Sequence, residues 1–221
     1  MSSAPAFQRA RKPDERAHRQ RAILEAAAAL FDAEGLPGVT LNAVARRAGI
    51  AKSNLYRYFE SREAMLLALL NEDQDAAVAL VEEKLARLRG PIDARAVAHV
   101  FAQVAVASPR FCVLQTALSG VLEQNLSEEA IAQYKRGVLR LGLRIGNALR
   151  AALPSLPARA TGPFMRYLHA VIAGLYPVAN PAPAAERVLR DPQFAVLRFD
   201  FAEDMEIMLA AVLGSLCGGV P

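Results

Sequence analysis

Apolar residues recur at helical spacing along most of the chain. In residues 19–35, Ile23, Ala27, Leu30 and Phe31 fall on one stripe, and Gly35 follows them as a typical helix-ending residue. Pro and Gly gather between the periodic runs, and the strict alternation of a half-buried strand is scarce. The pattern therefore predicts an all-α protein.

Two short runs follow the first predicted helix. Thr40 is a good N-cap residue, and it opens a run with one apolar face that ends at Gly49. A very short connection leads to the second run, KSNLYRYF, in residues 52–59. Two short helices joined by a Gly-bearing turn are the pattern of a helix-turn-helix, although many helical hairpins share it.

The remaining runs predict a larger helical body. Ser61 can cap a long helix that continues to about Leu88. Further helices are expected near 92–107, 109–124, 128–152, 162–178 and 194–216. The Pro-rich segment 176–193 is expected to be a loop with one or two helical turns. The organisation is a small three-helix unit, a connecting helix and a larger apolar body.

The charge of the chain is unevenly distributed. The 221 residues carry a formal net charge of +4, but residues 1–62 hold 11 Lys and Arg against 6 Asp and Glu, and residues 63–221 hold 15 against 16. A basic segment on a near-neutral body indicates a polyanionic partner. A solvated basic tail fits the charge alone equally well.

Several classes of function lack the residues they need. The chain has two cysteines, too few for a disulfide framework or a cysteine metal site, and three histidines. Glu15 and His18 have the spacing of one half of a di-iron site, but the second half is missing. No Gly-rich phosphate loop or nucleophile elbow occurs. We therefore expect no enzyme, no cofactor and no metal.

Membrane insertion and secretion are also not expected. The N-terminus is polar and Arg-rich, unlike a secretory signal, and no apolar run approaches the roughly 18 residues of a spanning helix. The sequence predicts a soluble, cytoplasmic protein.

The second short helix has the residues of a base-reading helix. Leu55 and Phe59, four residues apart, are predicted to face inward. The residues that then face outward are polar or basic: Lys52, Ser53, Asn54 and Arg57. Asn matches the major-groove edge of adenine, and Lys or Arg matches that of guanine. In a helix-turn-helix these residues meet base edges.

Other residues suit the phosphate backbone of DNA. Tyr56 and Tyr58 offer hydroxyl donors on rigid rings, although both could be ordinary packing aromatics. Thr40 brings a hydroxyl and the free N–H groups of a helix start. Arg62 begins the next helix and can reach the same backbone.

Residues 19–70 resemble the N-terminal domain of the TetR family of bacterial transcription regulators. The resemblance rests on LFDAEG, Thr40, VARRAGI, LYRYF and SREAML, whose combined spacing is far more specific than a generic helix-turn-helix. The family implies a homodimer that binds a palindromic double-stranded DNA operator. It also implies a helical C-terminal body with a small-molecule pocket and the dimer interface, in which ligand binding releases the DNA.

The resemblance also implies boundaries and site residues. It divides the chain into a flexible basic arm (1–18), a helix-turn-helix domain (19–62) and a ligand-binding and dimerisation domain (63–221). It assigns base contacts to Asn42, Lys52, Ser53, Asn54 and Arg57. It assigns phosphate contacts to Thr40, Tyr56, Tyr58 and Arg62.

The sequence departs from the family pattern at two positions. Ala51 stands where the family usually has a capping Ser or Thr, so the recognition helix is expected to start later, with Ser53 as a substitute cap. Arg62 stands where Lys is frequent, which keeps the positive charge.

The body mixes polar residues into apolar helices, as a small-molecule site requires. Each polar residue could equally be a satisfied core group. The candidate ligand contacts are His99, Gln103, Gln115, Thr116, Tyr134, Tyr167, His169 and Tyr176. Arg144 is the one cation considered for the pocket. This mostly uncharged set predicts a small, largely apolar effector with a few hydrogen-bonding groups.

The last two long helices predict a dimer. Each offers a broad apolar face, near 162–178 and 194–216, and together these faces are more than one core can easily hide. The best interpretation is a ligand-responsive, homodimeric transcription regulator, most readily a repressor. The alternative is a helical small-molecule-binding or scaffold protein without DNA function, which the basic N-terminal unit disfavours.

Overall fold

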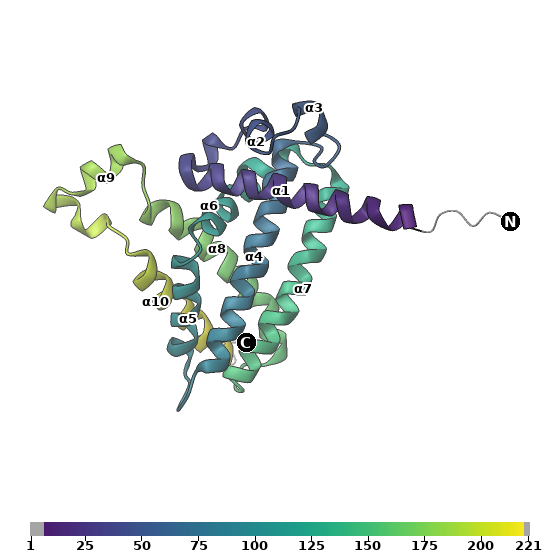
Figure 1. The fold of residues 1–221 in the computed structure, drawn as a ribbon. Helices are drawn as coiled ribbons and strands as arrows, with labels where there is room; N and C mark the ends of the chain where they lie inside the picture. The colour runs from purple at the N-terminus through teal and green to yellow at the C-terminus, as the bar shows by residue number, and fades with distance from the viewer. Residues whose placement is uncertain (1–6, 219–221) are drawn as a thin grey trace. The chain divides into compact units, whose positions relative to one another are not determined.

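The protein folds into two compact units. The computed structural model describes residues 7–218, with side chains from residue 15 onward except Ser119 and Val121. Residues 1–69 form unit 1 and residues 70–221 form unit 2. Every regular element in the described part of the chain is helical (Figure 1), which confirms the predicted all-α class.

Unit 1 contains the predicted three-helix arrangement. Its elements are α1 (Phe7–Gly38), α2 (Leu41–Arg47), α3 (Lys52–Leu55) and the start of α4 (Arg62–Arg87). The predicted stripe of α1 is buried, with Ile23 and Ala27 fully enclosed. Gly35 has a positive φ of 69° and interrupts the helical path of α1 where the sequence predicted its end.

Two expectations at the edges of unit 1 need correction. Helix α1 begins at Phe7, so residues 7–18 of the arm that was expected to be flexible belong to this helix, while residues 1–6 lie outside the described part. Helix α3 begins at Lys52, so the expected later start with Ser53 as its cap was wrong. Ala51 is extended and supplies no side-chain cap, but its carbonyl oxygen accepts from the backbone N–H of Asn54 at 2.9 Å. The backbone therefore closes this turn without a hydroxyl group.

The two predicted hydroxyl caps are confirmed. The Thr40 hydroxyl oxygen accepts from the backbone N–H of Ala43 at 3.2 Å, and that of Ser61 accepts from Ala64 at 3.0 Å. These bonds fix the starts of α2 and α4 by satisfying N–H groups that have no partner within the helix.

Arg62 holds the start of α4 to the turn between α1 and α2. Its Nε donates to the carbonyl oxygen of Val39 at 2.5 Å, and its Nη2 donates to that of Leu36 at 2.7 Å. The side chain is half-buried, and Nη1 lies 3.6 Å from a carboxylate oxygen of Glu63. A rigid guanidinium fork suits two carbonyl oxygens at once, which an ammonium group cannot reproduce.

Unit 2 follows the predicted helix order. It contains the rest of α4 and the helices α5 (Ala94–Val106), α6 (Pro109–Ala117), α7 (Glu128–Ala152), α8 (Thr161–Ala179), α9 (Pro183–Leu189) and α10 (Phe201–Gly218). Short π and 3₁₀ turns over Leu118–Asn125 end the helix predicted for 109–124. A 3₁₀ turn at Pro192–Leu197 replaces the predicted start of the last helix.

The core of unit 2 lies where α5, α8 and α10 meet. Helix α10 packs against α5 and α8. The rings of Phe101 and Phe164 meet edge to face, with their centroids 5.1 Å apart. Met205 and Leu209 of α10 are fully enclosed. These contacts fix three sides of the space described below.

The apolar faces of α8 and α10 are used differently from the prediction. Most of the residues expected to face a second copy are buried in the core of the same chain: Phe164, Val171, Ile172, Leu175, Met205 and Leu209. The periodic stripe therefore marked the internal contact. Tyr167 and Val178 of α8 and Ile207 and Met208 of α10 remain exposed.

Among the described residues, no single helix is long and apolar enough to cross a bilayer. Helices α5 and α6, bent by 88° at their junction, reach the required length and composition only as a pair.

The Arg62 contacts predict a local effect on stability. Arg62→Ala should destabilise unit 1 by about 1.5–3 kcal/mol, because it removes two hydrogen bonds from a charged donor. Hydrogen–deuterium exchange should accelerate in peptides covering residues 36–66. Arg46→Ala is the matched control, since Arg46 is an exposed arginine of α2. Equal exchange in the two variants would contradict the role given to Arg62.

Candidate functional site

Helix α3 presents a polar and basic face to solvent. Leu55 is fully buried and Phe59 is 5% exposed, as the four-residue spacing predicted. The exposed residues are Lys52, Ser53 and Asn54 of α3 and Tyr56 and Arg57 of the turn after it. Helices α2 and α3 pack against each other in unit 1 (Figure 1). Buried Leu55 and Phe59 thus anchor a short helix whose other side is free for a partner.

The other predicted DNA contacts differ in their exposure and in the hydrogen bonds that they already make. Thr40 and Asn42 are exposed on and beside α2, and Tyr58 is half-buried. The Arg62 guanidinium is already bonded to Val39 and Leu36. Its phosphate contact therefore stays a prediction, beside a structural role that the sequence did not show.

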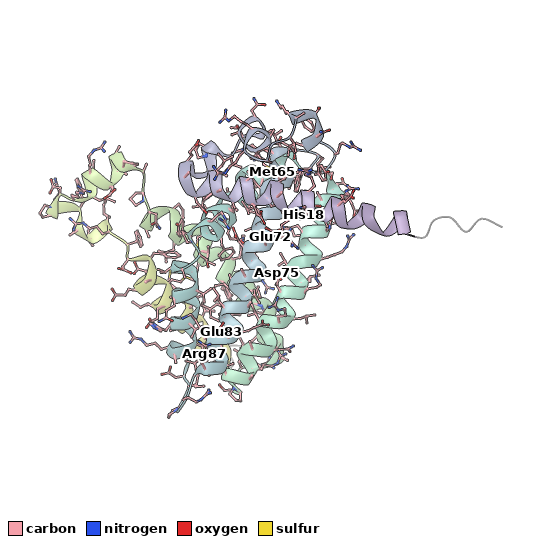
Figure 2. The ribbon with its side chains drawn as sticks, viewed as in Figure 1. His18, Met65, Glu72, Asp75, Glu83 and Arg87 are labelled. Carbon is pink, nitrogen blue, oxygen red and sulfur yellow. The ribbon has the colours of Figure 1, made fainter. Side chains whose placement is uncertain are left out.

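A basic hollow lies between α1 and the turn after α3. It has a volume of about 410 Å³ and is lined by Glu15, Arg16, His18, Arg19, Arg57 and Tyr58. The Nη2 of Arg16 donates to the carbonyl oxygen of Arg57 at 3.3 Å, and His18 lies on α1 (Figure 2). Arg16 and Arg19, spaced at i and i+3, extend the basic face beyond α3. This spacing was visible in the sequence, but it lay in the segment expected to be a flexible arm.

Unit 2 encloses an apolar cavity of about 480 Å³. Its walls come from α4, α5, α6, α7, α8 and α10. Aliphatic and aromatic side chains form most of the lining: Ala77, Val78, Val81, Phe101, Val104, Ala105, Phe111, Leu118, Val138, Leu141, Ile145, Met165, Leu168, Ile172 and Met205. A volume of this size suits a small organic ligand.

Four polar side chains from four helices meet in the cavity wall. Gln74 of α4 donates through Nε2 to Gln115 Oε1 of α6 at 2.8 Å and to the Tyr134 hydroxyl of α7 at 3.1 Å. Gln115 Nε2 lies 2.5 Å from Nδ1 of His169 on α8. Because an amide nitrogen only donates, this Nδ1 accepts and the imidazole proton resides on Nε2.

The Gln74 cluster, defined as Gln74, Gln115, Tyr134 and His169, is electrically neutral near pH 7. Burial lowers the pKa of His169 and the nearby Lys135 ammonium lowers it further, while Glu123 acts in the opposite direction. Burial also raises the pKa of the Tyr134 hydroxyl. The ammonium of Lys135 lies 2.5 Å from a Glu123 carboxylate oxygen, which compensates its charge.

Two family models match this chain. The model described as "Bacterial regulatory proteins, tetR family" matches residues 23–69, and the one described as "Tetracyclin repressor-like, C-terminal domain" matches residues 71–216. The chain belongs to the TetR family of transcription regulators. This TetR-family chain thus has the predicted DNA-binding helix-turn-helix in unit 1, and its second matched domain spans most of unit 2.

Two relatives with assigned roles match about a quarter to a third of the chain. The HTH-type transcriptional regulator RutR of Escherichia coli K12 is 40% identical over 57 residues, which cover 26% of this chain and 27% of RutR. UidR of the same strain is 34% identical over 71 residues, or 32% of this chain and 33% of UidR. The matches span a third or less of either relative.

Solved structures match nearly the whole chain in fold. A TetR/AcrR-family regulator from Thermobifida fusca YX-ER1 covers 90% of this chain and 98% of its own, with a TM-score of 0.55 and 20% identity. The fatty acid degradation regulator FadR from Bacillus halodurans covers 90% and 96%, with a TM-score of 0.54 and 16% identity. At this identity the likeness extends to the fold alone.

Three of the predicted ligand contacts of this TetR-family chain line the cavity: Gln115, Tyr134 and His169. Five lie outside it. His99 and Gln103 bond each other on the surface, where His99 also meets Glu206 at 2.6 Å. Helical periodicity alone could not distinguish these two sides of α5.

The remaining three are engaged or exposed elsewhere. The Thr116 hydroxyl donates to the carbonyl oxygen of Cys112 at 2.9 Å. Tyr167 is 51% exposed, and the Tyr176 ring meets Phe201 edge to face. Arg144 is also absent from the lining, because it pairs with Glu82 at 2.6 Å and with Asp75 at 3.1 Å. Asp75 projects from α4 in Figure 2.

Gln74 is the cavity residue that the sequence analysis missed. It follows Leu70 and precedes Val78 at four-residue intervals, so it occupies an apolar position of the α4 stripe. A polar side chain at such a position was the available indication. Among the residues that the structure describes, no group of His, Cys, Asp or Glu side chains is arranged to hold a metal ion.

The lowered pKa of His169 predicts an acid-sensitive cavity. The folded protein binds a proton at this imidazole less readily than the unfolded chain does, so stability falls as pH drops below about 6.5. The melting temperature of His169→Gln should decline less between pH 7.5 and 5.5 than that of the wild type. Calorimetry checks this, with His18→Gln, in unit 1, as the control expected to keep the wild-type slope. Parallel declines of all three proteins would contradict it.

Proposed function

We propose that this TetR-family regulator is a homodimeric repressor that binds a palindromic operator and releases it when a small, largely apolar effector fills the cavity of unit 2. The observation that carries the proposal is the exposed face of α3 and of the turn that follows it, where Lys52, Asn54 and Arg57 stand over buried Leu55 and Phe59. A short helix anchored in this way can present base-reading side chains to the major groove.

The surrounding residues support backbone contacts. Thr40 and Tyr56 are exposed near the same helices, and Arg16 and Arg19 add positive charge beside Arg57. Contacts to phosphate position a protein on DNA without reading its sequence. We assign Thr40, Tyr56, Tyr58, Arg62, Arg16 and Arg19 to this role, and Asn42, Lys52, Ser53, Asn54 and Arg57 to the bases.

Helix α4 supports coupling between the cavity and the DNA-binding unit. It runs without interruption from Arg62 to Arg87, so its first turns belong to unit 1 while Gln74, Val78 and Val81 line the cavity. A ligand releases DNA only if it binds the non-binding conformation more tightly. If a ligand in the cavity displaces α4, the two conformations of the protein differ in their affinity for that ligand.

The second candidate is a helical small-molecule-binding or scaffold protein without DNA function. The apolar cavity alone would fit it equally well. Retention on DNA that weakens with salt discriminates the two, because only the DNA-binding protein releases counterions on binding. Footprinting on the DNA flanking its own gene would then reveal an operator and its symmetry.

Base and phosphate contacts predict different mutant phenotypes. Asn54→Ala should weaken operator binding by about 1–3 kcal/mol and leave binding to random DNA nearly unchanged. The double variant Arg16→Ala, Arg19→Ala should weaken binding to both DNAs and reduce the salt slope by about 0.9 per lost phosphate contact. Fluorescence anisotropy at several salt concentrations measures both effects. Equal wild-type affinity for operator and random DNA would rule out base reading.

The exposed sides of α8 and α10 predict the dimer. Met208→Lys should give a folded monomer, because Met208 is 44% exposed and a charge there opposes an apolar two-fold contact without entering the core. Leu143→Lys on α7, also at an exposed leucine, is the control and should stay dimeric. Light scattering and circular dichroism report mass and folding. A folded wild-type monomer at micromolar concentration would refute the dimer.

A further inference from the structure

The Gln74 cluster is one hydrogen bond short. Both contacts of the Gln74 amide use its nitrogen, which donates to Gln115 and Tyr134. Its oxygen Oε1 is enclosed, and no protein group bonds it. An enclosed amide oxygen without a partner destabilises the protein, and a donor that reaches it restores the loss.

Gln74 is placed to receive such a donor from the cavity. It belongs to the cavity wall, in the midst of aliphatic and aromatic side chains. A turn of the amide would break the contacts of Nε2 with Gln115 and Tyr134. A ligand that carries an O–H or N–H group can supply the missing bond from the cavity while these contacts remain.

The charges around the cavity favour a neutral ligand. The lining has two cations and no carboxylate: Lys135 is paired with Glu123 at 2.5 Å, and Arg166 is an exposed residue of α8. The His169 ring accepts from Gln115 and carries no charge of its own in that state. Because Lys135 is already paired and Arg166 is exposed, an anionic group buried next to the Gln74 cluster would have no unpaired, buried cation to compensate it, which makes its transfer from water costly.

We propose that the effector is a neutral amphiphile, an aliphatic or aromatic body with one hydroxyl or N–H group, and that this group donates to Gln74 Oε1. The inference rests on the proposed function and deepens it, because Gln74 becomes the residue that selects the ligand. Gln74 also connects ligand selection to DNA release, because the helix that carries it, α4, begins in unit 1.

Three straight-chain probes test the proposal on the intact protein. Decanol offers a donor, decyl methyl ether replaces the hydroxyl hydrogen by a methyl group and so has no donor, and decanoate carries a negative charge. Calorimetric titration should show wild-type protein binding decanol about ten-fold more tightly than the ether, which is the size of one well-made hydrogen bond. Decanoate should bind more weakly than decanol. The wild-type comparison needs no mutation, so it is independent of any folding defect.

Two variants in α4 test whether Gln74 causes the preference for decanol over the ether. Gln74→Met keeps the length of the side chain and should reduce the ratio of decanol to ether affinity to about one. Val78→Ala, one turn further along the cavity wall, should weaken both probes by the same factor and keep the ratio. The decanol concentration that releases the operator should follow the same order across these proteins.

Each remaining outcome overturns a distinct claim. Equal wild-type affinity for decanol and the ether, with operator release by both, would refute the donor contact and leave the proposed regulator intact. Tighter binding of decanoate that disappears in Arg166→Met would replace the neutral ligand by an anion. Absence of binding by all three probes would refute both the apolar effector and this inference, while operator footprints would still test DNA binding separately.

Discussion

A single stripe of apolar residues on α4 has to serve two cores. Met65, Leu66 and Leu69 are buried on the part of the helix that belongs to unit 1, and Val78, Val81 and Leu85 are buried on the part that belongs to unit 2. Because the backbone hydrogen bonds of a helix repeat without a joint, its turns cannot move independently over a short distance. One helix therefore contributes buried side chains to both units.

Hydrogen bonds at the start of α4 hold the helices of unit 1 together. Arg62 bonds the carbonyl oxygens of Leu36 and Val39, and Ser61 caps the first turn. These bonds join α4 to the turn that precedes α2, and α2 in turn packs against α3. A movement of the first turn of α4 would therefore be transmitted through a few directional bonds to the helix that bears Asn54.

The sequence was sufficient where one residue type has one local role. Thr40 and Ser61 could be identified as caps, and the spacing of Leu55 and Phe59 identified the exposed side of α3, because these roles depend only on neighbours in the chain. It was insufficient where a residue has several possible partners. An arginine at the start of a helix suits a phosphate and a backbone carbonyl equally well, so sequence alone could not reveal the Arg62 contacts.

The same limit explains the mistaken expectations in unit 2. Periodicity shows that α8 and α10 are apolar on a broad face, but it does not show what covers that face. Most of the residues assigned to the dimer are covered by the same chain, while Ile207 and Met208 of α10 are exposed. Gln74 was missed for a related reason, because a polar residue within an apolar stripe gains its meaning only from the groups that other helices bring to it.

In the cavity of unit 2, the apolar lining and the neutral Gln74 cluster can contribute differently to ligand binding, the lining to affinity and the cluster to specificity. Burial of a ligand's apolar surface contributes about 25 cal/mol per Å² wherever the surface lies, so the aliphatic lining can hold many ligands of suitable size. One neutral hydrogen bond contributes only about 1 kcal/mol, but it is lost completely when the donor is absent or misplaced. Allosteric coupling energies are typically about 1–3 kcal/mol, so one directional bond to α4 is a substantial part of such a difference. In the proposed switch, apolar burial therefore supplies the binding energy, and the hydrogen bond to Gln74 selects the ligands that change the conformation of α4.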